Sequence, residues 1–220
     1  MEKLWSDVDQ YFGDILAPVD PELAATLAAN EAAGLPAIDV SRLQGKFLDL
    51  LVRISGATRI LEVGTLGGYS TIWMARAAGA HAKITTIEFN QRHAEAARKN
   101  IENAGMQDRV DIKIGAALDV LPALENTAPA PYDLIFIDAD KANNANYLSW
   151  AKKLSRPGSI IIVDNVVRDG KIIQADSEDP NILGTRKCAE MLGADPDLSG
   201  TVLQTVGAKG YDGFLMAIVK

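Results

Sequence analysis

The stretch that decides the fold is ILEVGTLGGYST, residues 60–71. It opens with an apolar run typical of a buried strand, passes through a turn that contains Gly64, Gly67 and Gly68, and ends where helical periodicity begins. Glycine permits such a tight turn because it has no Cβ atom. A strand, a short turn and a helix form the unit from which parallel sheets covered by helices are built.

The same alternation continues along the rest of the chain, after an N-terminal part that is helical. The sequence predicts an α/β fold: a doubly wound, Rossmann-like sheet, mostly parallel with a C-terminal antiparallel hairpin, with helices on both faces. We expect one domain over residues 1–220. The expected strands are 59–63, 83–87, 110–114, 132–137, 159–163, 201–206 and 213–219, and the expected helices are 5–16, 21–33, 41–54, 69–78, 91–104, 118–124, 147–154 and 185–192.

The composition disfavours several classes of partner. The chain carries a formal net charge of −7, whereas a nucleic-acid-binding protein needs a basic surface. An acidic surface is also repelled by anionic lipid, so we expect no membrane partner. The single cysteine, Cys188, permits no internal disulfide. Since neither a signal-peptide layout nor a transmembrane-length apolar run is visible, we expect a cytoplasmic location.

Ligands of doubly wound sheets bind beyond the carboxyl ends of the strands. Each of the first five expected strands ends in glycine or in an oxygen-bearing side chain. These positions are Glu62 with Gly64, Glu88, Gly115 to Ala117, Asp138 with Asp140 and Lys141, and Asp164 with Asn165.

The first two strand ends favour a cationic nucleoside cofactor over a dinucleotide. The turn after Glu62 lacks the G-x-G-x-x-G spacing that pyrophosphate sites use. Glu62 suits the ammonium group of a methionine moiety, and the carboxylate of Glu88 can accept two ribose hydroxyls. A turn made by glycine alone, with Glu88 capping the next helix, is the plainer alternative.

The later strand ends favour a hard metal ion. Asp138, Asp164 and Asn165 offer an all-oxygen donor set, which suits Mg²⁺, with Ca²⁺ or Mn²⁺ as other candidates. Lys141 follows three residues after Asp138, where it is a candidate base; the alternative is a solvated lysine paired with Asp140. His81 and His93 are expected to be ordinary surface residues. The aspartates could also serve only as turn or helix caps.

These motifs resemble the metal-dependent O-methyltransferases of the catechol and caffeoyl-CoA type. The resemblance is carried by residues 60–71, by ITTIEFN (84–90), IGAALDVLP (114–122), YDLIFIDADK (132–141) and GSIIIVDNVVRDGK (158–171), and by PAIDVSRLQG (36–45) and GAKGYDGF (207–214). It implies transfer of a methyl group from S-adenosylmethionine to one hydroxyl of an aromatic vicinal diol. One departure is Asn144, which stands where the family often has tyrosine.

The resemblance also assigns residues and partners. Lys141 would be the catalytic base, and Asp138, Asp164 and Asn165 would hold the metal. The N-terminal helices, residues 1–56, resemble lid and dimer elements, so a homodimer is expected. The implied S-adenosylmethionine site is Val40, Glu62, Gly64, Ser70, Glu88, Ala117 and Asp138.

Three other functions remain open from the sequence: a nicotinamide oxidoreductase on a similar sheet, a metal-independent methyltransferase, and a non-catalytic binding module. Binding of NAD, activity that survives metal removal, and failure to turn over would respectively favour each of them. The acceptor is also open, because free catechols, CoA thioesters, flavonoids and antibiotic precursors share the diol. The polar loop 168–181 is expected to close over it.

Overall fold

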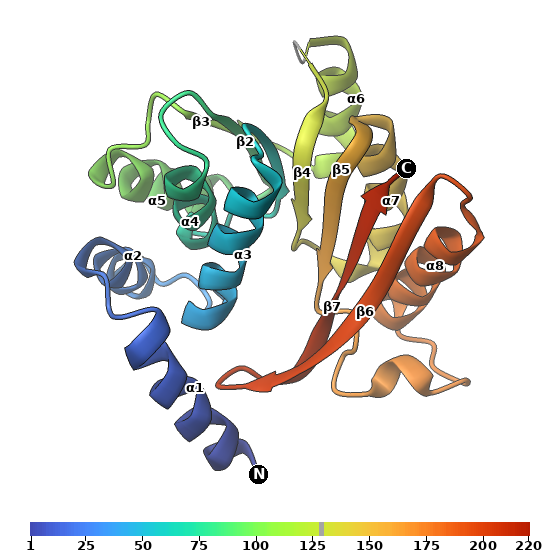
Figure 1. Ribbon diagram of the computed structural model, residues 1–220, viewed down its shortest axis with the longest axis horizontal. Coiled ribbons are helices and arrows are strands. Elements are labelled where there is room, and N and C mark those ends of the chain that lie inside the picture. The colour runs from blue at the N-terminus through green and yellow to red at the C-terminus, as the bar shows by residue number, and fades with distance from the viewer. Residues whose placement is uncertain (128–129) are drawn as a thin grey trace.

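The computed structural model describes residues 1–127 and 130–220 (Figure 1). A seven-stranded sheet runs in the order β3-β2-β1-β4-β5-β7-β6. Its first five strands along the chain are parallel, and β7 pairs antiparallel with both β5 and β6. The predicted fold class is therefore confirmed. The strands are β1 (Arg59–Val63), β2 (Lys83–Glu88), β3 (Val110–Ile114), β4 (Tyr132–Ile137), β5 (Ser155–Asp164), β6 (Leu198–Gly207) and β7 (Gly210–Val219).

Helices cover both faces of the sheet. Helices α3, α4 and α5 pack on one face and α6, α7 and α8 on the other, while α1 extends away from the sheet beside the β6–β7 turn (Figure 1). The helices are α1 (Glu2–Leu16), α2 (Pro21–Ala32), α3 (Arg42–Ser55), α4 (Tyr69–Ala77), α5 (Gln91–Asn103), α6 (Ala117–Thr127), α7 (Asn144–Lys153) and α8 (Pro180–Ala194), with 3₁₀ turns η1 (Lys141–Asn143) and η2 (Lys171–Ile173). None of the helices in the described residues is both long and apolar enough to cross a membrane.

The central strands are buried on both faces because their side chains alternate between two cores. In β4, Leu134 and Phe136 pack with α3 and α4, whereas Ile135 and Ile137 pack with α6 and α7. All four are at most 1% exposed. Full burial of one such side chain stabilises the fold by about 1.5–3 kcal/mol. These alternating contacts therefore stabilise the register of β4 with its neighbours β1 and β5, and in that register the strands end at the same edge of the sheet.

Several element boundaries differ from prediction, including those of β5, α8 and the β6–β7 hairpin. Strand β5 begins at Ser155 instead of residue 159, because an irregularity in its pairing with β4 takes in Pro157. Helix α8 begins at Pro180, where the Asp179 side chain caps it, so part of the expected loop 168–181 is helical. The hairpin pairs as far as Gly207 and Gly210, so its turn is shorter than expected.

Candidate active site

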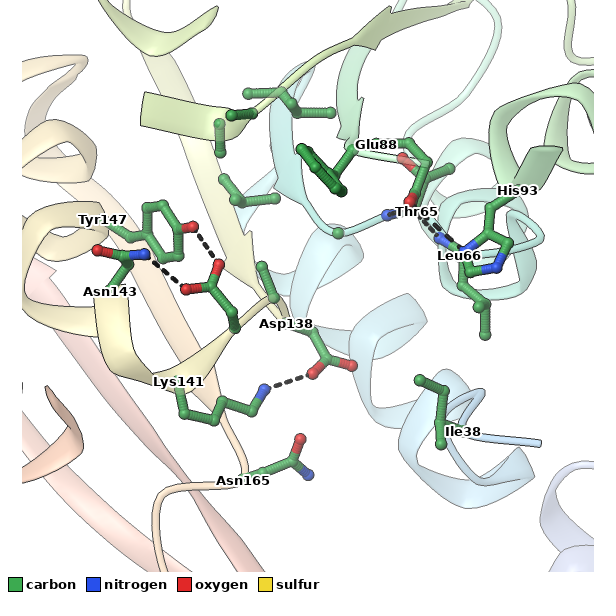
Figure 2. Close-up of a pocket in the computed structure, with 18 of the residues that line it drawn as sticks. Ile38, Thr65, Leu66, Glu88, His93, Asp138, Lys141, Asn143, Tyr147 and Asn165 are labelled. Atoms are coloured by element: carbon green, nitrogen blue, oxygen red, sulfur yellow. Dashed lines mark hydrogen bonds and ion pairs between the residues drawn. The ribbon is translucent and has the colours of Figure 1, made fainter. Parts of the chain in front are cut away.

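A cavity of about 810 Å³ lies at the carboxyl ends of β1, β2 and β4 (Figure 2). This volume falls within the usual range of small-molecule sites. Of the residues assigned to the cofactor by sequence, Val40, Gly64, Ser70, Glu88, Ala117 and Asp138 line it. Segments distant in the sequence thus meet in one site.

Gly64 brings the first turn into contact with the end of β4. Its φ is +100°, and a Cβ atom there would lie 2.1 Å from the backbone oxygen of Asp138. Only glycine combines this left-handed backbone with so close an approach. Leu66, in the same turn, also has a positive φ, of 49°. The turn is therefore strained at the cavity wall, as backbone at binding sites often is.

Glu88 holds this turn in place while facing the cavity. Its Oε2 accepts the backbone N–H groups of Thr65 at 3.2 Å and Leu66 at 2.8 Å, and Oε1 accepts that of Asn90 at 2.9 Å. A carboxylate offers about four acceptor directions. Glu88 therefore keeps room for about one more donor, fewer than the two ribose hydroxyls that the sequence suggested.

The prediction that His93 is an ordinary surface residue is wrong. His93 lines the cavity, with Nδ1 3.5 Å from Oε1 of Glu88 (Figure 2). The signal was available in its position in the first turn of α5, directly after the strand end that carries Glu88. His81 is exposed, as predicted.

Glu62, which the resemblance assigns to the cofactor site, is not among the residues that line the cavity. Glu62 is fully buried and accepts hydrogen bonds from Ser70 at 2.6 Å, from Thr86 at 2.6 Å and from Thr71. Burial raises the pKa of the Glu62 carboxyl to about 7. Since Ser70 lines the cavity, Glu62 acts by orienting that hydroxyl and the start of α4.

Asp39 is a cavity residue that the sequence analysis missed. It lies beside Val40, is half-buried, and accepts a hydrogen bond from Asn30 at 3.0 Å. Asn100 in turn donates to Asn30 at 2.8 Å and to the carbonyl of Gly67 at 2.9 Å. Burial raises the pKa of the Asp39 carboxyl. This chain of amides joins α2, α5 and the glycine turn to an acidic group in the cavity.

The three predicted metal ligands lie where two cavities meet. Asp138 lines the large cavity, Asp164 lines a second cavity of about 330 Å³, and Asn165 lines both. Asn165 has a φ of 56°, a left-handed conformation that directs the chain sharply after β5. Burial, followed by the nearby charge of Asp138, raises the pKa of the Asp164 carboxyl.

The donor chemistry of this set fits a hard divalent cation. Two carboxylates and one carboxamide supply oxygen only, as Mg²⁺, Ca²⁺ and Mn²⁺ prefer. Over residues 1–127 and 130–220, no three His, Cys, Asp or Glu side chains group as a metal site would require. The predicted set does not count as such a group, because its third donor is the carboxamide of Asn165 and asparagine is not one of these four residue types.

Lys141 pairs with Asp138, not with Asp140. Its Nζ lies 2.7 Å from Oδ1 of Asp138, and the residue is only 8% exposed (Figure 2). Asp140 instead accepts hydrogen bonds from the hydroxyl of Tyr147 and from Asn143 at 2.6 Å. The alternative of a solvated lysine paired with Asp140 is therefore wrong, and the lysine ammonium faces the cavity beside the predicted metal ligands.

Helix α8 packs directly against the turn that carries Lys141. A Cβ atom at Gly184 would lie 2.5 Å from the carbonyl oxygen of Lys141 and 2.4 Å from that of Ala142. Asn144 is fully buried and donates to the Thr185 hydroxyl at 3.3 Å. Asn144, which stands where the family often has tyrosine, thus contacts α8 and is not among the residues that line either cavity.

The segment after β5 borders the large cavity through Arg168 and Asn181. Arg168 and Asp169 have φ values of 57° and 54°. Oδ1 of Asp212, on β7, accepts the backbone N–H groups of Val167 and Arg168, each at 2.9 Å. The start of the predicted closing loop is therefore anchored to β7.

Comparison with known proteins agrees with this geometry. A family model described as O-methyltransferase matches residues 19–216. A catechol O-methyltransferase of Mycobacterium tuberculosis is 51% identical, over 97% of this chain and 96% of that protein. A crystal structure of an O-methyltransferase from Bacillus cereus in complex with SAH has a TM-score of 0.99 and 55% identity, with 100% of both chains covered. The O-methyltransferase TomG from Streptomyces achromogenes, in complex with SAM, has a TM-score of 0.96 and 43% identity, with 100% of this chain and 98% of that chain covered.

Proposed function

The chain belongs to the O-methyltransferase family as an S-adenosylmethionine-dependent enzyme, and from that premise we propose that it methylates one hydroxyl of a metal-chelated aromatic vicinal diol. The observation that carries the proposal is the ion pair between the buried Lys141 and the half-buried Asp138, beside Asp164 and Asn165. A base and an oxygen donor set for a cation thus meet at the end of the cofactor cavity.

The cofactor site is proposed from the walls of the large cavity. Gly64 lets the backbone approach the cofactor, and Glu88 has about one free acceptor position for a ribose hydroxyl. Val40, Ser70, Ala117 and Asp138 are the other predicted residues that line this cavity, and the geometry adds the carboxylate of Asp39 to those of Glu88 and Asp138. An acidic wall suits S-adenosylmethionine, whose sulfonium and ammonium groups are cationic.

Asp138, Asp164 and Asn165 would hold the divalent cation, with Mg²⁺ as the first choice and Ca²⁺ or Mn²⁺ as alternatives. When bound, it would bring the two diol oxygens together and lower the pKa of one hydroxyl. Lys141 acts as the base once its ammonium, which pairs with Asp138, has released a proton to solvent. The neutral Nζ then takes the proton of that hydroxyl. The oxygen then forms a bond to the methyl carbon as the bond from carbon to sulfur breaks, which leaves S-adenosylhomocysteine.

A catechol-type acceptor is the substrate class that we propose. Support comes from the 51% identical relative named catechol O-methyltransferase and from the second cavity, where the rings of Phe47 and Phe214 lie 4.9 Å apart beside Asp164. The two rings are tilted by 41° to each other and give this cavity an apolar wall against which an aromatic acceptor packs.

A homodimer through α1 is also proposed. Apolar side chains stand exposed along this helix: Leu4, Val8, Tyr11, Phe12, Ile15 and Leu16 are between 45% and 64% exposed. A contiguous exposed apolar surface marks an interaction site. Light scattering should give twice the chain mass, and Tyr11→Asp should shift it to the monomer; a wild-type monomer would refute this proposal.

The reaction is tested with purified protein, S-adenosylmethionine and a panel of 3,4-dihydroxy aromatics, with Mg²⁺ or with EDTA. Product mass should rise by one methyl group with Mg²⁺ only. A rise that survives EDTA would instead support a metal-independent methyltransferase. No rise on any diol, with cofactor binding confirmed separately, would refute the acceptor class.

A further inference from the structure

Helix α3 reaches the proposed metal site through one side chain. Nε2 of Gln44 donates to Oδ2 of Asp164 at 2.6 Å, across 120 positions of the chain. Gln44 lies in the first turn of α3, where Ser41 caps the helix by accepting the backbone N–H of Gln44 at 3.2 Å. This contact is not predictable from the sequence, because nothing local to Gln44 indicates Asp164.

The bonds to Asp164 determine which of its acceptor directions stay open. Oδ1 accepts the backbone N–H of Asn165 at 2.8 Å, and Oδ2 accepts Gln44. Each oxygen therefore retains about one further lone pair. Asp164 is only 4% exposed, so water does not compete strongly for these positions. The two donors fix the plane of the carboxylate.

The chemistry of Gln44 suits this task. A carboxamide N–H orients a carboxylate without bringing a positive charge, whereas a lysine or arginine there would repel a cation. A carboxylate in its place would repel Asp164 in the metal-free protein. Groups that orient a metal ligand in this way strongly influence metal affinity.

We propose that Gln44 is a positioning residue for the divalent-cation site, holding the Asp164 carboxylate in the orientation that binds the metal. This inference rests on the metal-dependent activity proposed above. It also assigns a role to the N-terminal helices: α3 contributes to the metal site through Asp164, in addition to any part in oligomerisation.

The test measures Mn²⁺ binding to the metal-free protein by electron paramagnetic resonance of the free ion. Gln44→Met removes the donor and keeps the length of the side chain. The matched control is Gln10→Met, because Gln10 donates to Asp14 at 2.8 Å in an exposed glutamine–aspartate pair on α1. Thermal unfolding in EDTA and the Kd for S-adenosylhomocysteine show that each variant is folded. If Gln44→Met lacks a cooperative transition, Gln44→Asn, whose amide is one methylene too short, replaces it.

The expected result is a Kd for Mn²⁺ about 10- to 100-fold higher in the Gln44 variant. The control should match the wild type, and both variants should bind S-adenosylhomocysteine normally. An unchanged Kd for Mn²⁺ in a folded Gln44 variant would overturn the inference and leave the proposed function standing. A wild-type protein that binds no Mn²⁺ would overturn the metal-dependent function itself, and the inference with it.

Discussion

Replacing Gly184 with alanine should displace the turn that carries Lys141. The new Cβ would stand 2.4 Å from the carbonyl oxygen of Ala142, whereas ordinary contacts begin at 3.4 Å. The difference, 3.4 less 2.4, means that α8 or the turn must move by about 1 Å. Overpacking of this kind costs about 1–3 kcal/mol, which exceeds the ~0.5–1 kcal/mol that alanine gains over glycine inside a helix.

Gly193 provides the matched control, because it lies in the same helix and an added Cβ would meet nothing within 4 Å. Gly193→Ala should therefore stabilise the protein by about 0.5 kcal/mol. In a chain of this size, 1 kcal/mol corresponds to about 2–4 °C in Tm. The control should raise Tm by about 1–2 °C, and Gly184→Ala, with a net cost of up to about 2.5 kcal/mol, should lower it by up to about 10 °C.

Thermal unfolding and turnover of a catechol acceptor measure the two consequences. A displacement of about 1 Å at a reacting group lowers turnover by about 100-fold, so Gly184→Ala should lose activity while it still binds S-adenosylhomocysteine. The control should keep full activity. Equal rises in Tm for both variants, or undiminished turnover in Gly184→Ala, would refute the inference that close packing at Gly184 holds the turn of Lys141 in position.

Three other variants test separate parts of the site. Lys141→Met should lower turnover by about 10²–10⁴-fold with an unchanged Kd for S-adenosylhomocysteine; comparable loss of both would contradict its role as base. The folded-state pKa of Glu62, about 7, lies above its ordinary value of 4.5, so its stabilising contribution is full below pH ~4.5 and falls by about 3 kcal/mol as pH rises to ~7. Glu62→Gln should therefore flatten Tm against pH in that window, and an unchanged slope would show that Glu62 does not titrate there. Gly64→Ala should destabilise the protein by about 1–3 kcal/mol more than Gly79→Ala, since both glycines have positive φ but an added Cβ at Gly79 meets nothing within 4 Å; equal effects in denaturant unfolding would exclude the overlap with Asp138.

The sheet was predictable because its central strands are short runs of apolar residues bounded by turn signals. Residues 134–137, LIFI, are buried on both faces, and this pattern belongs to a parallel strand covered by helices. The residues just past such strands were also predictable as a group, since parallel strands end at one edge. Asp138 and Asn165 meet the same cavity for this reason.

Side-chain direction and contacts across long sequence separations were not predictable in this way. Glu62 lies within β1, as the expected strand 59–63 has it, but its side chain points toward a face of the sheet, where hydroxyls from α4 and β2 bury it. Gln44 meets Asp164 only because α3 packs over the sheet end. His93 was expected to lie away from the strand ends, but the first turn of α5 follows β2 so closely that its side chain lines the cavity.

The strand order also governs how the protein assembles during synthesis. Strand β7 is the last along the chain, yet it lies between β5 and β6. While β6 emerges, it has no neighbour in the sheet, because its partner segment 210–219 is still to follow. That segment also carries Asp212, which holds the backbone after Asn165, and Gly213, whose carbonyl accepts the N–H of Val166 at 2.9 Å. A nascent chain that has completed five parallel strands therefore still lacks the support of its proposed metal site. Shortening the protein before Gly210 would remove β7 and leave β6 without a strand to pair with.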